Sequence, residues 1–332
     1  MDVKIKDVAQ LAGVSISTVS NTLSGKKNVS SEKQAAVMEA VRRLGYVPNI
    51  NAQLLKSRRT GNIGLFLPYI DGLFYTTLMQ EVYHACTEKE YGMFTHVARD
   101  FDSQKTAATI LSCNIDAAIV LNDHLLDSEI ETLAARGIPL VFKDRHIVQK
   151  GVSSIVIDNQ SGTAQQVNYL KHTGHKKIAY LCGVCNHDGN ERKEAFLEAM
   201  KNVQLPVMDD LLMEGQFSRR VAYNCVYEML HRGDTARPDA ILCANDEMAF
   251  GCMDALKDMH VSVPKDISVM GFDDLGAETC SPPLTTVGYS MRDFAYQAVE
   301  EAVRLIQDPK SEGVLKTLET QMKIRNSVAF RF

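Results

Sequence analysis

From Ile63 onward, short apolar segments alternate with amphipathic stretches, and this alternation restricts the possible folds more than any other feature of the chain. The apolar segments have the length of strands and are nearly continuous. Such strands are buried on both faces, which is typical of parallel sheets covered by helices. The expected strands cover residues 63–67, 93–98, 117–121, 139–143, 154–157, 178–182, 240–244, 267–272 and 285–289, with a terminal strand near 318–325.

Amphipathic patterns fill the gaps between these strands. The expected helices cover residues 75–91, 103–113, 127–136, 160–173, 190–202, 219–232, 246–259 and 291–307. The number of expected strands is too large for one small sheet. We therefore predict an α/β fold with two doubly wound parallel-sheet lobes. In such folds ligands bind at the carboxyl ends of the strands, which directs attention to the polar residues just after each strand.

Residues 1–47 carry no strand pattern and predict a separate, all-α head. The expected helices cover residues 5–12, 16–24 and about 31–44. Residues 1–60 hold ten Lys and Arg against four acids, a net +6 in a chain whose total is −5. The remainder therefore carries −11. A basic head on an acidic body is typical of a head that binds a polyanion, although a solvated basic face gives the same pattern.

Residues 5–21 predict a helix-turn-helix. Gly13 supplies a tight turn, and Ser15 is placed to cap the second helix. The residues expected to face the core are Val8, Leu11, Ala12, Val14, Val19 and Leu23. Two short helices joined by a glycine turn form the motif whose second helix enters the major groove. A generic helical hairpin is the alternative.

The second helix carries the candidate base contacts. Ile16 can pack on a thymine methyl, Ser17 can bond several base edges, and Asn21 has the geometry for bidentate pairing with adenine. The full set of expected DNA contacts on this helix is Ser15, Ile16, Ser17, Thr18, Ser20 and Asn21.

Several motifs together resemble the lactose/galactose repressor family. They are "IKDVAQLAGVSISTVSNTLSG", "VSSEKQAAVMEAVRRLGYVPNINAQLL", "TGNIGLFLP", "GHKKIAYLCG", "CANDEMAFG", "VPKDISVMGFDD" and "SPPLTTV", in order over essentially the whole chain. The resemblance implies a head (1–47), a hinge (48–60) and a sensor of the type I periplasmic-binding-protein fold (61–332). It further implies an N-lobe of about 61–159 and 290–316, a C-lobe of about 160–289 and 317–332, and a homodimer.

The resemblance also implies a hinge that folds on DNA. Residues 49–56 match the family's hinge helix, with Asn49 and Ala52 as expected contacts and Leu55 matching a leucine wedged into the minor groove. Eight residues cannot hold a helix alone in water, so folding would depend on DNA and a partner hinge. A plain linker anchored by its leucines is the alternative. The family usually has arginine where this chain has Asn21, which shifts the expected preference from guanine toward adenine.

In the sensor, residues near strand ends resemble the family's effector-contacting positions. They are Phe74, Tyr75, Asp144, Arg192, Phe217, Asn245, Asp246 and Asp273. Aromatic rings with Asp, Asn and Arg suit a polyhydroxylated or heterocyclic ligand. Other roles stay open: the two aspartates after strands can cap helices, the phenylalanine at 217 can be core, and the arginine can pair on the surface. Around that arginine the match loosens, which leaves the alignment of His187 and Asn190 open.

The sequence therefore predicts a DNA-binding transcription regulator, expected to repress a catabolic operon under control of a small-molecule effector. A sugar or sugar phosphate is the expected effector, with a nucleobase as the alternative. The expected partners are pseudo-palindromic double-stranded operator DNA, the effector and a second copy of the chain. Without a leader or an apolar run long enough for a membrane span, we expect a cytoplasmic protein.

Two other classes were considered, a soluble sugar-binding protein and an α/β enzyme. The basic head opposes the first, and the absence of a GxGxxG, a Walker-type loop or a nucleophile–base pattern opposes the second. We expect no catalytic residue, no cofactor and no metal, since the nine histidines show no ligand spacing. Cys182 and Cys185 have redox-motif spacing, so a redox role for them stays open.

Overall fold

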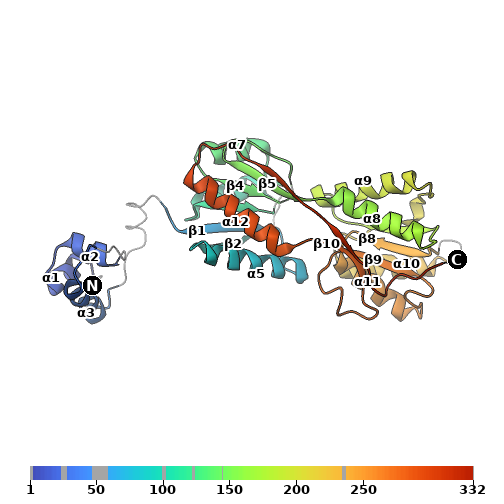
Figure 1. The fold of residues 1–332 in the computed structure, drawn as a ribbon, viewed down its shortest axis with the longest axis horizontal. Helices are drawn as coiled ribbons and strands as arrows, with labels where there is room; N and C mark the ends of the chain where they lie inside the picture. The colour runs from blue at the N-terminus through green and yellow to red at the C-terminus, as the bar shows by residue number, and fades with distance from the viewer. Residues whose placement is uncertain are drawn as a thin grey trace. The chain divides into compact units, whose positions relative to one another are not determined.

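The computed structural model describes residues 3–23, 28–46, 59–98, 102–121, 124–143, 145–233 and 237–331. The chain divides into two compact units, Met1–Thr60 and Gly61–Phe332, which we call the head and the sensor (Figure 1). Four residues with expected functions, Asn49, Ala52, Leu55 and Asp144, lie outside the described residues.

The head consists of α1 (Ile5–Ala12), α2 (Ile16–Leu23) and α3 (Ser31–Leu44) packed around a small apolar core. The turn after α1 places Gly13 at φ 66°, a left-handed conformation that glycine adopts without strain. The Ser15 hydroxyl accepts a hydrogen bond from the Thr18 amide at 3.1 Å, so the predicted cap is confirmed. Leu11 is 47% exposed, contrary to its predicted core position. The inward face of α1 is centred on Val8 and Ala9, and Leu11 lies at its edge.

The N-lobe of the sensor is a six-stranded sheet in the order β11-β5-β4-β3-β1-β2, with every pair parallel. Its strands are β1 (Asn62–Leu67), β2 (Gly92–Val97), β3 (Ala117–Val120), β4 (Leu140–Phe142), β5 (Val152–Ile157) and β11 (Leu315–Leu318). Helices cover both faces because the strands are apolar on both. One face packs against α5 (Gly72–Glu88) and α12 (Met291–Gln307), and the other against α6 (Ser103–Ser112) and α7 (Asp127–Ala135).

The C-lobe repeats this design with a sheet in the order β12-β10-β9-β8-β6-β7. Its strands are β6 (Ile178–Cys182), β7 (Leu212–Glu214), β8 (Ala240–Cys243), β9 (Ser268–Asp273), β10 (Thr285–Gly288) and β12 (Gln321–Lys323). Its helices are α8 (Asn159–His172), α9 (His187–Asn202), α10 (Arg219–His231) and α11 (Asp246–Asp258), with a short 3-10 helix at Asp209–Leu211. Only β12 runs antiparallel to its neighbour among the described strands of this sheet.

The predicted α/β fold with two parallel-sheet lobes and a helical head is confirmed. Two strand predictions needed correction. The single terminal strand expected near 318–325 is two strands, β11 and β12, which belong to different lobes because the chain crosses between them at Glu319 and Thr320. The strand β7 was not expected from the sequence. Among the described residues, no helix is long and apolar enough to cross a membrane.

The chain passes between the lobes three times, after β5, after β10 and after β11 (Figure 1). Each passage joins the carboxyl end of a strand in one sheet to the next element of the other lobe. The strand ends of both sheets therefore face one another across the junction, where doubly wound folds bind ligands.

Candidate functional site

The outer face of α2 carries the candidate DNA contacts. Ile16 is 52% exposed, and Ser17 beside it is also exposed, so both side chains are accessible to a partner. The hydroxyl of Ser15 lies 2.7 Å from that of Ser17 and 2.9 Å from that of Thr18. Because Ser15 also caps α2, its hydroxyl already has local partners. Thr18, like Ser20 and Asn21, is partly buried.

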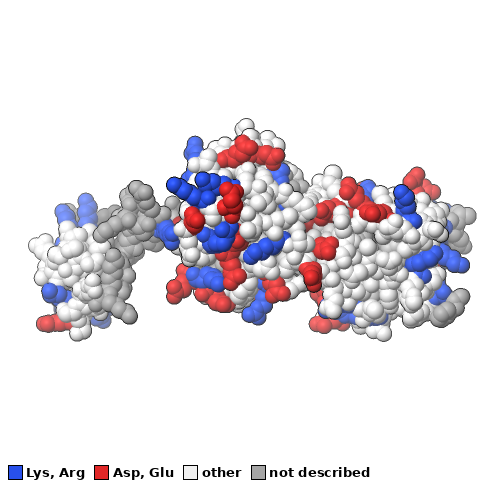
Figure 2. All heavy atoms as spheres, turned by 45° about the horizontal axis from the view of Figure 1, so that its top comes forward, with Lys and Arg blue, Asp and Glu red and all other residues white. Residues whose placement is uncertain are grey.

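Cationic side chains lie on the surface of the head. Figure 2 shows lysine and arginine groups on the face of the head that it presents. Arg42 and Arg43 at the end of α3 have side chains that are 75% and 70% exposed, and both lie near Glu39. Exposed cations of this kind contact phosphates without reading sequence. The head thus has a short helix with exposed side chains, α2, and positive charge on its surface.

In the sensor, a hollow lies between the carboxyl ends of the two sheets. It is lined by Asp71, Gly72, Phe74, Tyr75, Leu121, Lys143, Asn186, Asp188, Arg192, Phe217, Asn245, Glu247 and Asp273. Six of the eight residues expected at the effector site are among them. The cavity volume is about 90 Å³, well below the roughly 300 Å³ of ordinary small-molecule sites. The Lys143 side chain of the N-lobe contacts Asp188 of the C-lobe across this narrow hollow, an arrangement of the lobes that we call closed.

Arg192 is fixed at the centre of the hollow from four directions. Its Nε donates to the Asn159 side-chain oxygen at 2.8 Å, and its Nη1 donates to the Ala244 carbonyl at 2.6 Å. The guanidinium lies 3.7 Å from the ring centroid of Phe272, a cation–π contact, and 3.4 Å from a carboxylate oxygen of Asp273. A planar group held this firmly presents fixed donors to a ligand. Its alternative role, a surface ion pair, is excluded because the side chain is buried.

Lys143 and Asp188 form an ion pair between the lobes. Lys143 follows β4 in the N-lobe and is only 2% exposed, and its Nζ lies 2.5 Å from Asp188 on α9 of the C-lobe. Asp188 also accepts a hydrogen bond from the Asn159 amide at 3.0 Å. Although burial acts against ionisation, Lys143 and Arg192 hold the pKa of Asp188 below its ordinary value. The Asp188 carboxyl group is therefore ionised at neutral pH.

The pKa of Asp273 is raised, whereas that of Asp188 is lowered. Burial raises the pKa of Asp273 to about 6, although the Arg192 and Lys143 cations oppose this. Its backbone has φ 113°, in the region that favours glycine, directly at the end of β9. A carboxyl group with this pKa can accept or donate a hydrogen bond near neutral pH.

Asp246 is not among the residues that line the hollow, and its carboxylate has partners elsewhere. Its carboxylate accepts hydrogen bonds from the Thr286 hydroxyl at 2.6 Å and from the Leu275 amide at 2.8 Å. It therefore joins α11 to β10 and to the loop after β9. Burial, followed by the neighbouring charge of Asp273, raises its pKa well above the ordinary range. Adjacent residues after a strand point in different directions, and Asn245, which does line the hollow, also caps α11 at 2.9 Å.

Aromatic rings line the other side of the hollow. Phe74 and Tyr75 lie in the first turn of α5, with ring centroids 5.0 Å apart in an edge-to-face arrangement. The Lys143 ammonium lies 5.4 Å from the Phe74 ring centroid. Phe217 packs against the C-lobe core, as one of the two weighed roles predicts, and it also lines the hollow, where its effector contact stays a prediction.

Sequence reasoning missed Lys143 and Asp188. Lys143 had been assigned to the end of an apolar strand, and a lysine at the carboxyl end of a buried strand is a signal that could have been used. Asp188 stands in the segment where the family match loosens. Nothing in the local pattern shows that the two residues meet, because they come from different lobes.

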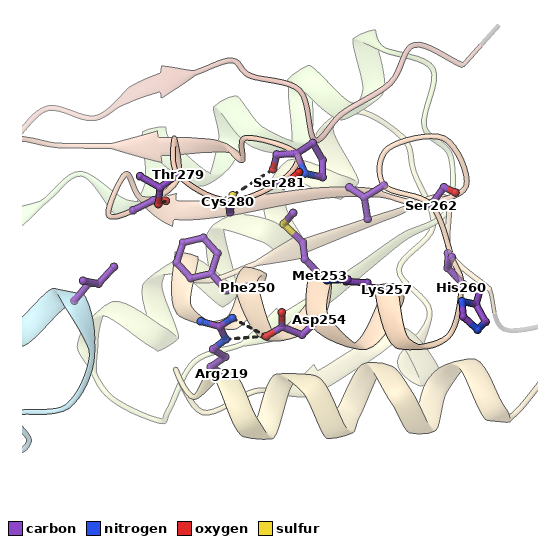
Figure 3. Close-up of a pocket in the computed structure, with 15 residues that line it drawn as sticks. Arg219, Phe250, Met253, Asp254, Lys257, His260, Ser262, Thr279, Cys280 and Ser281 are labelled. Atoms are coloured by element: carbon purple, nitrogen blue, oxygen red, sulfur yellow. Dashed lines mark hydrogen bonds and ion pairs between the residues drawn. The ribbon is translucent and has the colours of Figure 1, made fainter.

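A second, larger hollow of about 810 Å³ lies mainly in the C-lobe (Figure 3). Phe250, Met253 and Asp254 from α11 line it, and Arg219 pairs with Asp254 at 2.7 Å. Its lining includes few of the residues expected at the effector site, because it lies beside α11 and away from most of the strand ends between the lobes.

Comparison with known proteins agrees with this geometry. The family model for bacterial regulatory proteins, lacI family, matches residues 4–49, and that for a periplasmic binding protein-like domain matches residues 167–328. The HTH-type transcriptional repressor PurR of Haemophilus influenzae (strain PittEE) is 30% identical over 335 residues, with 98% of both chains covered.

Two further relatives agree. The probable HTH-type transcriptional repressor ExuR of Bacillus subtilis (strain 168) is 28% identical over 333 residues, again with 98% of both chains covered. A solved structure of the transcriptional regulator CelR in complex with cellobiose has a TM-score of 0.72 and 28% identity, covering 98% of this chain and 99% of that one. The chain belongs to the lacI family of bacterial regulatory proteins, DNA-binding transcriptional repressors with an effector-binding domain, and not to a family of enzymes.

Proposed function

We propose that this protein represses a catabolic operon and is controlled by a hydroxylated small molecule with an acidic group, a sugar phosphate or a sugar acid, bound between the lobes. The observation that carries the proposal is the buried Lys143 in the hollow, paired with Asp188. A lysine is rarely buried unless its charge is used, and here it stands within the residues that a ligand would touch.

Ligand binding requires the hollow to open, because its present volume of about 90 Å³ is too small for a sugar. Opening separates Lys143 on one lobe from Asp188 on the other. An uncharged sugar would not replace the Asp188 carboxylate beside this buried lysine, which is unfavourable. A phosphate or carboxylate group on the ligand replaces the anion that Lys143 loses. An acidic ligand therefore offsets the free-energy cost of opening the hollow, whereas a neutral ligand does not.

The remaining lining groups suit hydroxyl groups. Asp188, Asp273 and Asn245 offer oxygen acceptors, and Arg192 offers fixed donors. Phe74 and Phe217 provide apolar surfaces for the face of a sugar ring. The CelR regulator complexed with cellobiose supports a carbohydrate as the class of ligand.

For the head, we propose that α2 enters the major groove and that Ile16, Ser17 and Asn21 touch base edges, with Ser15, Thr18 and Ser20 toward the backbone. A helix of two turns reaches only a few base pairs. Specific binding therefore needs two heads on two half-sites, which means a homodimer on a pseudo-palindromic operator. The hinge contacts proposed at Asn49, Ala52 and Leu55 complete this interface.

A thermal-shift screen of the full chain tests the effector class. Sugar phosphates and sugar acids are compared with neutral sugars and with purines, since a ligand at 100 times its dissociation constant stabilises the protein by about 2.7 kcal/mol. The Lys143→Met variant serves as the control, and it should lose the response to an acidic ligand. A response to neutral sugars or purines that Lys143→Met leaves unchanged would refute the proposed ligand class.

Binding-site selection with the full chain tests the DNA function. We expect a pseudo-palindromic site whose affinity falls steeply with salt and changes when the identified ligand is added, typically by about 1–3 kcal/mol. Absence of any selected sequence would refute the operator proposal while leaving the ligand result standing.

A further inference from the structure

A group of metal-ligand residues lies at the edge of the hollow, outside the residues that line it. His146, His187 and Glu191 each offer one ligand atom, and these atoms all lie within 4.8 Å of one another. His146 belongs to the N-lobe, in the segment after β4. His187 and Glu191 belong to α9 of the C-lobe. The cluster therefore spans the junction between the lobes.

The distances within this cluster match those between the ligands of a tetrahedral metal ion. The Nε2 atom of His187 lies 3.4 Å from one oxygen of Glu191, and the Nε2 of His146 lies 3.8 Å from the other. Zinc bonds of about 2.0–2.1 Å in a tetrahedron place neighbouring ligand atoms roughly 3.3 Å apart. Only small side-chain rotations would bring all three groups onto one ion.

Two features of these side chains fit metal binding. The Nε2 atom of His187 is buried and makes no hydrogen bond in the structure. It lies 3.4 Å from a Glu191 oxygen without hydrogen-bonding to it, and a metal ion between the two atoms would bind both. Glu191 accepts a hydrogen bond from the Asn159 amide at 2.9 Å, which fixes the direction of its carboxylate. Support of this kind behind a ligand is common at metal sites.

The spacing on α9 also fits. His187 and Glu191 are four residues apart and share one face of the helix, so both can reach one ion without bending the backbone. The local sequence could not reveal the third ligand, because His146 lies on another lobe. Imidazole with one carboxylate favours zinc and similar transition metals over magnesium or calcium, which prefer oxygen.

We propose that His146, His187 and Glu191 bind a divalent transition metal ion, most simply zinc, and that this ion links the two lobes. Three protein ligands leave a fourth position for water. Because the ligands come from both lobes, the ion binds the closed arrangement in preference to an open one and shifts the equilibrium toward it. The metal is thus a second small-molecule input to the same conformational change, and this inference does not depend on the identity of the effector.

Zinc binding by the chelator-treated full chain tests the site. Calorimetric titration with zinc should show one tight site, cobalt should give the absorption of a tetrahedral complex, and magnesium should give no binding at the same concentration. The His146→Gln and Glu191→Gln variants should each weaken zinc binding by at least about tenfold. In wild type, but not in His146→Gln, zinc should raise the melting temperature.

Two matched variants separate this site from other zinc binders. His172→Gln removes an exposed histidine of α8 and should bind zinc as wild type does. Cys185→Ser removes an exposed thiol two residues before His187 and should also leave binding intact. If zinc binds wild type and His146→Gln equally, or if only Cys185→Ser loses it, the proposal is wrong. His146 is half exposed, so its substitution is compatible with folding, and circular dichroism of the variant checks this.

Discussion

Replacing Lys143 with methionine removes the N-lobe partner of the buried ion pair while keeping most of the side-chain volume. The Nζ of Lys143 lies 2.5 Å from Asp188, which is itself almost fully buried. In the variant, Asp188 keeps the Asn159 amide at 3.0 Å and the Arg192 guanidinium at 3.9 Å. The Asp188 carboxylate therefore loses its strongest partner but keeps two others.

Removing one member of a buried ion pair costs about 3–5 kcal/mol. Because two partners of Asp188 remain, we expect the lower end, a loss of about 3 kcal/mol in the free energy of unfolding of the sensor. Adding Asp188→Asn removes the uncompensated charge. The double variant should therefore recover part of the loss, with a coupling energy of up to about 3 kcal/mol between the two positions.

Urea unfolding at neutral pH, followed by far-ultraviolet circular dichroism, measures these differences. The chain has no tryptophan, so fluorescence is not a convenient probe. Lys193→Met is the matched control: Lys193 lies on α9, pairs with Glu214 at 3.2 Å and has a side chain that is 38% exposed, so its loss should cost below about 1 kcal/mol. If Lys143→Met is no more destabilising than Lys193→Met, the buried pair does not hold the lobes together, and the argument for an acidic effector loses its basis.

Three further predictions concern single residues. Asn21→Arg should change the preferred base at one position of each half-site, from adenine toward guanine, and recovery of the same base by both proteins in binding-site selection would refute the assigned contact. Asp273, whose pKa rises from 3.8 to about 6 on folding, should make the sensor less stable as pH increases from about 4 to 6, with no further change above. In Asp273→Asn the urea midpoint should change less with pH over that interval. An unaltered pH dependence of the midpoint would contradict the raised pKa. Gly13→Ala should destabilise the head by about 1–2 kcal/mol because φ is 66° there, while the melting of the sensor should not move.

Local patterns predicted the elements of the fold closely. The expected helices 103–113 and 291–307 differ from α6 and α12 by one residue at most, because strong apolar periodicity and clear helix ends agree there. The strand β7 escaped notice because Leu212–Glu214 is short and not fully buried, so it carries no apolar run. The terminal segment was predicted as one strand because only tertiary pairing shows that β11 and β12 join different sheets.

The lining of the hollow between the lobes was predictable where the family resemblance supplied positions, and less so where contacts join residues of different lobes. Arg192 and Asp273 were expected and do lie together, 3.4 Å apart. Asp246 was expected beside them, but its carboxylate points to Thr286 instead. Lys143 was hidden within an apolar strand, and its partner is forty-five residues away. A contact between residues of different lobes produces no local periodicity in the sequence from which it could be predicted.

Contacts between the lobes differ in strength, and this difference determines what a ligand must overcome. On one side, the Leu73 amide donates to Glu247 at 3.2 Å in an exposed position, where water competes with the bond. On the other, His146 and Glu191 are 3.8 Å apart, too far for a strong bond without an ion between them. The Lys143–Asp188 pair is the one buried contact of the three. A ligand that replaces this pair therefore changes the balance between the open and closed lobes most, since only differential contacts with the two states can shift an equilibrium.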